Sequence, residues 1–193
     1  MRKLIAFNHV TLDGYFVSAD GKFQWASKGN DDQEYSAFVA ENASKGGELV
    51  FGRITYQMMA SYWPTPIADQ HSPEVARGMN SMGKIVFSRT LEQATWNNTR
   101  LIRTGNDVGD LVSEVHKLKE EDGPGMAILG SGSIIAQLAP HGLIDEYQMM
   151  IDPVALGKGR SMFEAIPEQL NLKLAKSRIF NNGKVFLCYE PLL

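Results

Sequence analysis

The sequence contains one cysteine and no block of like charge. Cys188 lies within the apolar run 185–189, so the chain cannot form an internal disulfide, and we expect a buried thiol without a chemical role. The formal net charge is only −3, and the lysines and arginines are spread along the chain. Because this distribution would not attract a polyanion, nucleic acid is not an expected partner.

Long apolar runs, metal-ligand patterns and a nucleophile turn are also missing. No run approaches the roughly 20 residues of a membrane-spanning helix. Residues 1–8 become polar too early for a signal peptide, so we expect a cytoplasmic protein without a membrane partner. The four histidines, at positions 9, 71, 116 and 141, have unrelated spacings, so we expect packing or surface roles and no metal site. The G-x-S-x-G turn of serine hydrolases does not occur.

The chain does contain an alternation of strand and helix patterns. With 44% hydrophobic residues, no repeat and no long linker, residues 1–193 are expected to form one domain. Strands are expected near 3–10, 49–52, 84–88, 97–103, 126–129 and 144–152, with helices from 31 or 32, through 55–59, from 107, and over 132–139. This alternation predicts an α/β fold whose mostly parallel sheet has helices on both faces. The alternating run 170–175 and the turn Asn182-Gly183 predict an antiparallel C-terminal hairpin at an edge.

Turns rich in hydrogen-bond donors follow three of the predicted strands. Gly52, Arg53 and Thr55 offer close backbone approach, a guanidinium and a hydroxyl at the start of a helix. The second turn is Ser88-Arg89-Thr90. Its two hydroxyls flank a guanidinium, and this set of donors suits a phosphate monoester. The third turn is Gly130-Ser131-Gly132-Ser133-Ile134, and it also leads into a helix.

Each of these turns also has a simpler interpretation. Residues 130–132 match only the opening of the dinucleotide fingerprint, because Ile135 stands where its third glycine would be, and a plain helix entry fits as well. Residues 88–90 taken alone fit a solvated turn. Ligands of open α/β sheets bind beyond the carboxyl ends of the strands, where all three turns lie. Together the three turns predict a dinucleotide cofactor.

Several motifs in a fixed order identify a family resemblance. They are residues 2–7, Thr11-Leu12-Asp13-Gly14-Tyr15, Phe51-Gly52-Arg53-x-Thr55-Tyr56, Tyr62-Trp63-Pro64, residues 84–91, residues 130–133, residues 144–147 and Pro153-Val154-x-Leu156-Gly157-x-Gly159. With these motifs the chain resembles, almost from end to end, the dihydrofolate reductase-like family that includes the reductase domain of bacterial riboflavin biosynthesis (RibD C-terminal type). The resemblance implies an eight-stranded, mostly parallel sheet, NADPH lying across the strand ends, and a homodimer.

The resemblance also implies roles for the three turns. Gly52, Arg53 and Thr55 would hold the phosphates of the cofactor, and residues 130–134 would lie against its pyrophosphate. Residues 88–90 would form the pocket for the 2′-phosphate that distinguishes NADPH from NADH. Residues 10–14 would border the nicotinamide. The implied chemistry is hydride transfer to a C=N or C=O carbon of a small heterocycle, such as a pterin, an aminopyrimidine or a ribosylaminopyrimidine.

Two carboxylates are candidate catalytic groups. Asp13 is either a carboxylate that faces the ligand or the acceptor of an Asp-Gly turn. Dihydrofolate reductases carry a carboxylate on their first helix, and Asp32 is the candidate for that role here. Capping of the helix explains Asp31 and Asp32 equally well.

Aromatic residues are candidate substrate contacts, because their faces suit a flat heterocycle. Trp25 lies just before the first helix, and Tyr62 and Trp63 lie in the loop 62–66, where core packing is the alternative. That loop replaces the acidic loop of riboflavin-pathway reductases. Those reductases also carry an acidic residue just before the second glycine turn, where this chain has Ile128-Leu129, and a zinc deaminase domain whose ligands are absent.

The sequence therefore predicts an NADPH-dependent reductase of a small heterocycle and leaves the riboflavin-pathway substrate open. An alternative is a non-catalytic nucleotide-binding or sensing protein that keeps the cofactor pocket. A flavin-binding protein is a third reading, and it predicts a yellow purified product.

Overall fold

An eight-stranded sheet forms the centre of the computed structural model, which describes residues 1–27, 32–105 and 107–192. The sheet has the strand order β5-β4-β3-β6-β1-β7-β10-β9, and β2 pairs with β8 in a separate two-stranded ribbon. The strands are β1 (Leu4–Thr11), β2 (Tyr15–Ser18), β3 (Glu48–Gly52), β4 (Gly83–Ser88), β5 (Thr99–Arg103), β6 (Met126–Leu129), β7 (Glu146–Asp152), β8 (Gly159–Ser161), β9 (Leu172–Ile179) and β10 (Val185–Pro191). The helices are α1 (Gln33–Ser44), α2 (Arg53–Ala60), α3 (Pro66–His71), α4 (Pro73–Ser81), α5 (Val108–Glu120) and α6 (Gly132–Leu138), with short 3₁₀ turns η1 (Gln24–Ser27) and η2 (Ala139–His141).

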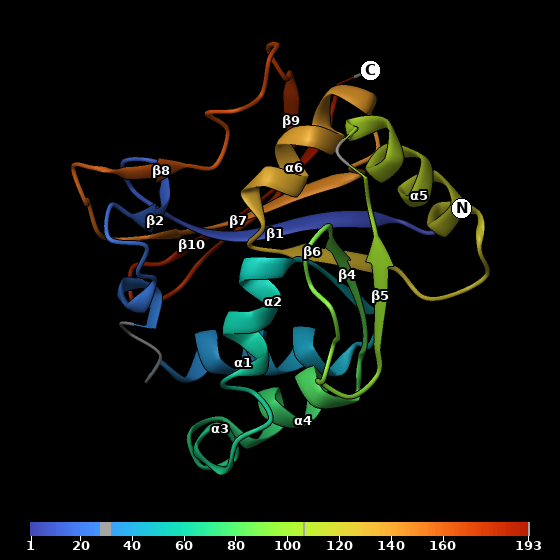
Figure 1. Ribbon diagram of the computed structural model, residues 1–193. Helices are drawn as coiled ribbons and strands as arrows, with labels where there is room; N and C mark the ends of the chain where they lie inside the picture. The colour runs from blue at the N-terminus through green and yellow to red at the C-terminus, as the bar shows by residue number, and fades with distance from the viewer. Residues whose placement is uncertain (28–31, 106, 193) are drawn as a thin grey trace.

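The strand directions confirm the predicted fold class. Strands β5, β4, β3, β6, β1 and β7 pair in parallel, whereas β10 runs antiparallel to both β7 and β9. The turn between β9 and β10 contains Gly183 with φ +82°, a conformation that favours glycine. The predicted C-terminal hairpin is therefore present, and it extends the parallel sheet at one edge (Figure 1).

Helices cover both faces of the sheet, as Figure 1 shows, with α5 and α6 on one side and α1 and α4 on the other. The side under α5 and α6 holds one continuous apolar cluster. Leu111 and Leu118 of α5 and Ile135 of α6 pack there against Leu4 and Val50 of the sheet. This face provides a continuous support for the strands that end at the candidate site.

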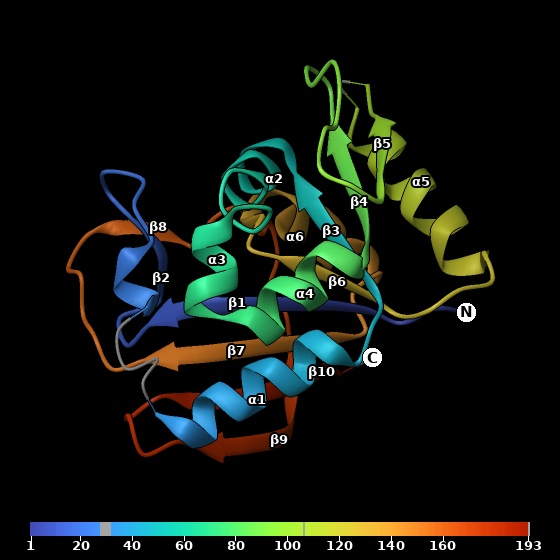
Figure 2. The same ribbon diagram turned by 90° about the horizontal axis from the view of Figure 1, so that it is seen from below.

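The core on the opposite face is divided into two clusters. One lies under α2 and α4 and includes Phe51 and Tyr56, and the other lies under α1 and includes Tyr35 and Phe186. Figure 2 shows the same division, with α1 beside β7 and β10 and with α2 toward β3. The second cluster also contains Cys188, which is buried as predicted, and this burial raises the pKa of its thiol to about 11. Strands β1 and β6 lie between the two clusters.

Buried cations fix the edge of the sheet where the parallel strands begin. Lys84 donates to the carbonyls of Met82 at 2.7 Å, Asn97 at 3.1 Å and Asn80 at 3.2 Å. Arg2 is paired with Glu48 and donates to the Pro124 carbonyl at 2.6 Å. These side chains satisfy backbone carbonyls in loops, so we assign them a structural role. No described helix is long and apolar enough to cross a bilayer.

Candidate functional site

The structure brings the three donor-rich turns to one edge of the sheet. Strand β3 lies between β4 and β6 and is parallel to both. The turns that follow these neighbouring strands therefore begin at Ser88, Gly52 and Gly130 on the same side of the molecule. Figure 1 shows the starts of α2 and α6 close to each other. The predicted convergence of the turns depends on this strand order, which the sequence did not specify.

Two of the turns are in direct contact. The backbone N–H of Gly52 donates to Ser131 Oγ at 2.9 Å, and that hydroxyl donates to the Leu129 carbonyl at 3.2 Å. Gly130 and Ser131 both adopt left-handed backbone conformations, with φ +61° and +52°. A Cβ atom on Gly130 would lie 3.2 Å from Thr55 Cγ2, so the turn and the first turn of α2 are closely packed. We call this contact between the two turns the Gly52–Ser131 junction.

The helices that begin at this junction have no side-chain cap. Gly52, the N-cap of α2, has no side chain, and the side chain of Ser131, the N-cap of α6, accepts no hydrogen bond from its helix. Side chains of Asp32, Thr65 and Asp107 do cap α1, α3 and α5, whereas α4 also begins without a side-chain cap. N–H groups in the first turn of a helix need an acceptor and carry partial positive charge. The uncapped ends of α2 and α6 therefore fit a bound anion with several oxygens, such as a diphosphate.

The third turn follows β4, the neighbour of β3, and carries the cation Arg89. Ser88 Oγ accepts hydrogen bonds from the backbone N–H groups of Leu91 at 2.9 Å and Thr90 at 3.2 Å. Ser88 is buried, whereas Arg89 and Thr90 are exposed. On the first turn of α2, the exposed Arg53 donates to Gln57 Oε1 at 3.0 Å. The serine therefore shapes the turn, and the exposed residues are the ones that a ligand can reach.

Residues 132–134 have different environments within one helical turn. Ser133 is exposed, but Ile134 is buried in the core and its N–H donates to the Ser131 carbonyl at 2.8 Å. Gly132 is buried and packs closely against Phe16, because a Cβ atom at this position would lie 2.8 Å from Phe16 Cζ. Gly132 and Ile134 thus hold the turn in place, and Ser133 is the side chain directed outward.

Asp13 connects two loops through its carboxylate. It accepts hydrogen bonds from the backbone N–H of Leu156 at 3.0 Å, from that of Gly157 at 2.7 Å and from the Thr11 hydroxyl. The Thr11 hydrogen bond, followed by that from Gly157, holds the pKa of Asp13 below its ordinary value of 3.8. The carboxylate therefore ties the turn to residues 156–157, and the catalytic role of Asp13 stays a prediction.

Asp32 forms the helix cap that the sequence offered as its alternative role. Its Oδ1 accepts from the backbone N–H of Tyr35 at 2.7 Å, and it is the N-cap of α1. Asp31 lies outside the described residues. The capping contact does not test the catalytic role of Asp32, which stays a prediction.

The predicted aromatic contacts lie in two places. Trp63 packs against the cluster under α2, and its indole N–H donates to Met59 Sδ at 3.1 Å. Tyr62 is exposed and meets Trp63 edge-on at 5.1 Å between ring centroids. Trp25 is 8% exposed, and its Nε1 has no hydrogen-bond partner among the described residues. An N–H without an acceptor in so buried a place makes Trp25 the candidate with the clearest unmet need for a ligand or water.

Sequence reasoning missed a polar cluster beside Trp25. His9 Nδ1 and Asp152 Oδ2 are 2.8 Å apart, and the other oxygen of Asp152 accepts from Lys184. Lys184 also donates to the Ala26 carbonyl at 2.9 Å. These residues are far apart in the sequence, and no local pattern links them.

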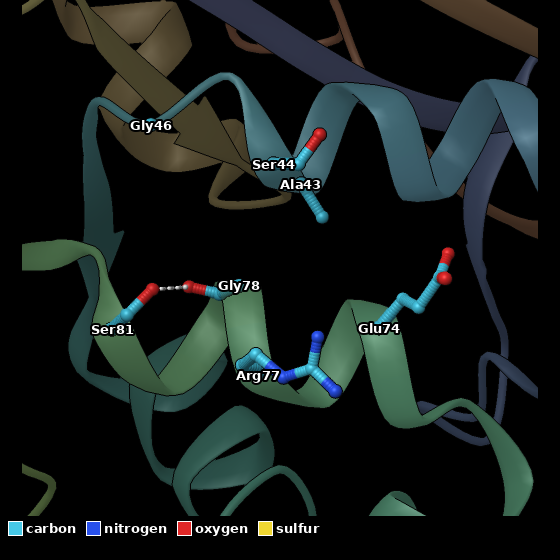
Figure 3. Close-up of a pocket in the computed structure, with 7 residues that line it drawn as sticks. All are labelled: Ala43, Ser44, Gly46, Glu74, Arg77, Gly78 and Ser81. Atoms are coloured by element: carbon cyan, nitrogen blue, oxygen red, sulfur yellow. Dashed lines mark hydrogen bonds between the residues drawn. The ribbon is translucent and has the colours of Figure 1, made fainter.

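A surface hollow elsewhere is separate from this site. It has a volume of about 420 Å³ and lies between α1 and α4, as Figure 3 shows. The helices touch at its floor, where a Cβ on Gly78 would lie 2.5 Å from the Ala43 carbonyl oxygen. Glu74 and Arg77 at its rim are exposed. None of the predicted site residues lines it. Among the described residues, no group of three or more histidine, cysteine or acidic side chains is placed to hold a metal ion.

Comparison with known proteins identifies relatives over the whole chain. The sequence profile of the RibD C-terminal domain family matches residues 2–186. Two proteins of Bacillus subtilis (strain 168) are similar, the uncharacterized proteins YyaP and YwjB. YyaP is 28% identical over 189 residues, covering 98% of this chain and 95% of YyaP. YwjB is 24% identical over 185 residues, covering 94% of each chain.

Solved structures share the fold. A putative riboflavin biosynthesis protein from Shewanella sp. PV-4 is 22% identical with a TM-score of 0.69, and the match covers 99% of both chains. A deaminase/5-amino-6-(5-phosphoribosylamino)uracil reductase from Thermotoga maritima is 13% identical with a TM-score of 0.69, and the match covers 99% of this chain but 57% of that one. The dihydrofolate reductase of Enterococcus faecalis, solved with NADP(H) and RAB-propyl, is 15% identical with a TM-score of 0.64, covering 98% of this chain and 96% of that one.

Proposed function

Because the chain belongs to the RibD C-terminal domain family, we propose that it is an NADPH-dependent reductase of a small heterocycle of the pterin or pyrimidine type. The observation that carries this proposal is the Gly52–Ser131 junction, where two helices without side-chain caps begin, together with the exposed Arg89 in the turn after the neighbouring strand β4. Such an arrangement offers backbone N–H groups to a diphosphate and a guanidinium to a separate phosphate. NADPH carries both groups.

The residues present fit this cofactor in the following way. The first turns of α2 and α6, with Arg53, Thr55 and Ser133, would hold the pyrophosphate. Arg89 and Thr90 would hold the 2′-phosphate, with Ser88 shaping their turn. The end of β1 would border the nicotinamide, which supplies a hydride to the substrate. The dihydrofolate reductase of Enterococcus faecalis, which shares the fold and was solved with NADP(H), supports the choice of NADPH as the cofactor.

The substrate class rests on the relatives and on the aromatic residues of the site. The Thermotoga maritima relative is named for a pyrimidine reductase activity, and a Corynebacterium diphtheriae structure of 16% identity and TM-score 0.65 is titled pyrimidine reductase-like. Trp25 is buried against Phe23, with ring centroids 5.2 Å apart, whereas the exposed Tyr62 would provide a surface for a flat ring. We further propose that the protein works as a homodimer in the cytoplasm.

A binding measurement and a turnover panel test this function. We expect NADPH to bind more tightly than NADH to the purified protein. We also expect NADPH to be consumed with at least one member of a panel containing 7,8-dihydrofolate, a dihydropterin and ribosylaminopyrimidines. Tight NADPH binding without turnover of any member would favour a nucleotide-binding protein without catalysis. Absence of NADPH binding would contradict the proposal itself.

A further inference from the structure

The end of β1 holds a histidine beside the second glycine turn. Strand β6 ends at Leu129, opposite Phe7 of β1, and the N–H of Gly130 donates to the Phe7 carbonyl at 3.3 Å. His9 lies two residues farther along β1, on the same face as Phe7. The core on this face is divided into two clusters, and His9 belongs to β1, which lies between them.

A buried carboxylate holds the His9 ring, and a buried lysine is paired with that carboxylate. Asp152 Oδ2 is 2.8 Å from His9 Nδ1, and because a carboxylate only accepts, Nδ1 carries the hydrogen. The side chains of Asp152 and Lys184 are 2% and 1% exposed, whereas that of His9 is 15% exposed. The imidazole is thus the member of the cluster that a ligand can reach. Its Nε2 lies 3.4 Å from the Tyr35 hydroxyl, a long contact that a substrate heteroatom would have to replace.

Charged and polar groups face His9 from the elements packed against it. Asp152 and Lys184 form a buried ion pair, and the other oxygen of Asp152 faces His9 Nδ1. On the α1 side, Tyr35 OH is 3.4 Å from Nε2, and its burial raises its pKa above 10.0, so it remains neutral near physiological pH. Asp32, at the start of the same helix, is engaged in the cap. Histidine is the residue type in this set that ordinarily titrates near neutrality.

We propose that His9 Nε2 donates the proton that completes reduction of the heterocycle, with Asp152 and Lys184 as positioning residues; this rests on the proposed function. As the hydride bonds to the carbon of the C=N or C=O group, the π electron pair moves to the heteroatom. The Nε2–H bond breaks, and its proton forms the new N–H or O–H bond. The neutral imidazole then regains a proton from water.

The variant His9→Gln tests the role directly. Glutamine can keep a hydrogen bond to Asp152 but cannot deliver a proton. We expect kcat to fall about 10²- to 10⁴-fold, the range of general acid catalysis, while the Kd for NADPH changes less than about twofold. The wild-type kcat should fall as pH rises, because a general acid must carry its proton, and this limb should be absent in His9→Gln. Asp152→Asn should also lower kcat, and its pH limb should move. The matched control His71→Gln changes an exposed residue of α3 and should have no effect.

A measurement without turnover separates this inference from the proposed function. The probe is 5,6-diaminouracil added with NADP⁺ to ¹⁵N-histidine-labelled protein, with the His9 signals assigned from their loss in His9→Gln. We expect the Nε2 signal of His9 to shift and that of His71 to stay. An unmoved His9 Nε2 signal, or an unchanged kcat and pH profile in His9→Gln, would overturn the role of His9 while leaving NADPH-dependent reduction intact. If the wild-type protein did not bind NADPH, that result would instead contradict the proposed function.

Discussion

Replacement of Ser131 probes the junction on which the cofactor site is built. In Ser131→Ala, the Gly52 N–H loses its acceptor and the Leu129 carbonyl loses a donor. The two turns would remain adjacent but would no longer be fixed to each other. We therefore expect lower stability together with weaker NADPH binding.

The magnitude follows from the hydrogen bonds and the backbone. A buried polar group left without a partner costs about 1–3 kcal/mol, and Ser131 is 7% exposed, so water does not readily replace the hydroxyl. For two affected groups, both on half-buried residues, we expect Ser131→Ala to lower the free energy of unfolding by about 1–2 kcal/mol. Ser131→Gly loses the same bonds but relieves the left-handed conformation at φ +52°. Glycine also gives the unfolded chain more conformational entropy, which offsets part of this gain. We therefore expect Ser131→Gly to be more stable than Ser131→Ala by about 0.5–1 kcal/mol.

Urea unfolding followed by tryptophan fluorescence measures these differences. The control Ser113→Ala changes an exposed residue of α5 and should remain within about 0.5 kcal/mol of the wild type. A Ser131→Ala variant that also remains within that range would refute the junction as a stabilising contact. A Ser131→Gly variant less stable than Ser131→Ala would refute the reasoning about the backbone.

Three further predictions concern single groups. Arg89→Ala should weaken NADPH binding roughly 10- to 100-fold and NADH binding far less, because only NADPH carries the 2′-phosphate; equal losses in calorimetric titrations would contradict the assignment. Asp13→Asn should be less stable than the wild type at neutral pH. The lowered pKa of Asp13 gives a stabilisation that is present above 3.8 and is lost as pH falls through the folded pKa, so the gap between the two proteins should narrow in acid urea titrations. A gap that is constant with pH would show that the charge plays no part. Cys188 should react with a thiol reagent far more slowly in the folded than in the unfolded protein, because it is buried and its pKa is raised to about 11, and equal rates would contradict its burial.

Local patterns predicted the architecture, because each depends on neighbouring residues. The strand and helix alternation, the Asn182-Gly183 turn and the glycine turns at 52 and 130 all act within a few residues. The cap at Asp32 was also visible, since a helix start needs only a side-chain acceptor three residues before an N–H. Even the burial of Cys188 followed from its apolar neighbours.

Contacts between distant segments could not be predicted in the same way. The hydrogen bond from Gly52 to Ser131 depends on β3 and β6 being neighbours, and the ties of Asp13 to residues 156–157 depend on where the loop after β7 returns. His9 was expected to have an ordinary packing or surface role. Its pairing with Asp152 arises because β1 and β7 are neighbours, and spacing along the chain carries no signal of it.

The most direct test of the account is a crystal structure of the protein grown with NADPH. We expect the pyrophosphate between the first turns of α2 and α6, and the 2′-phosphate beside Arg89 and Thr90. NADPH bound at another face, or crystals without NADPH at saturating concentration, would contradict the claim that these three turns form a cofactor site.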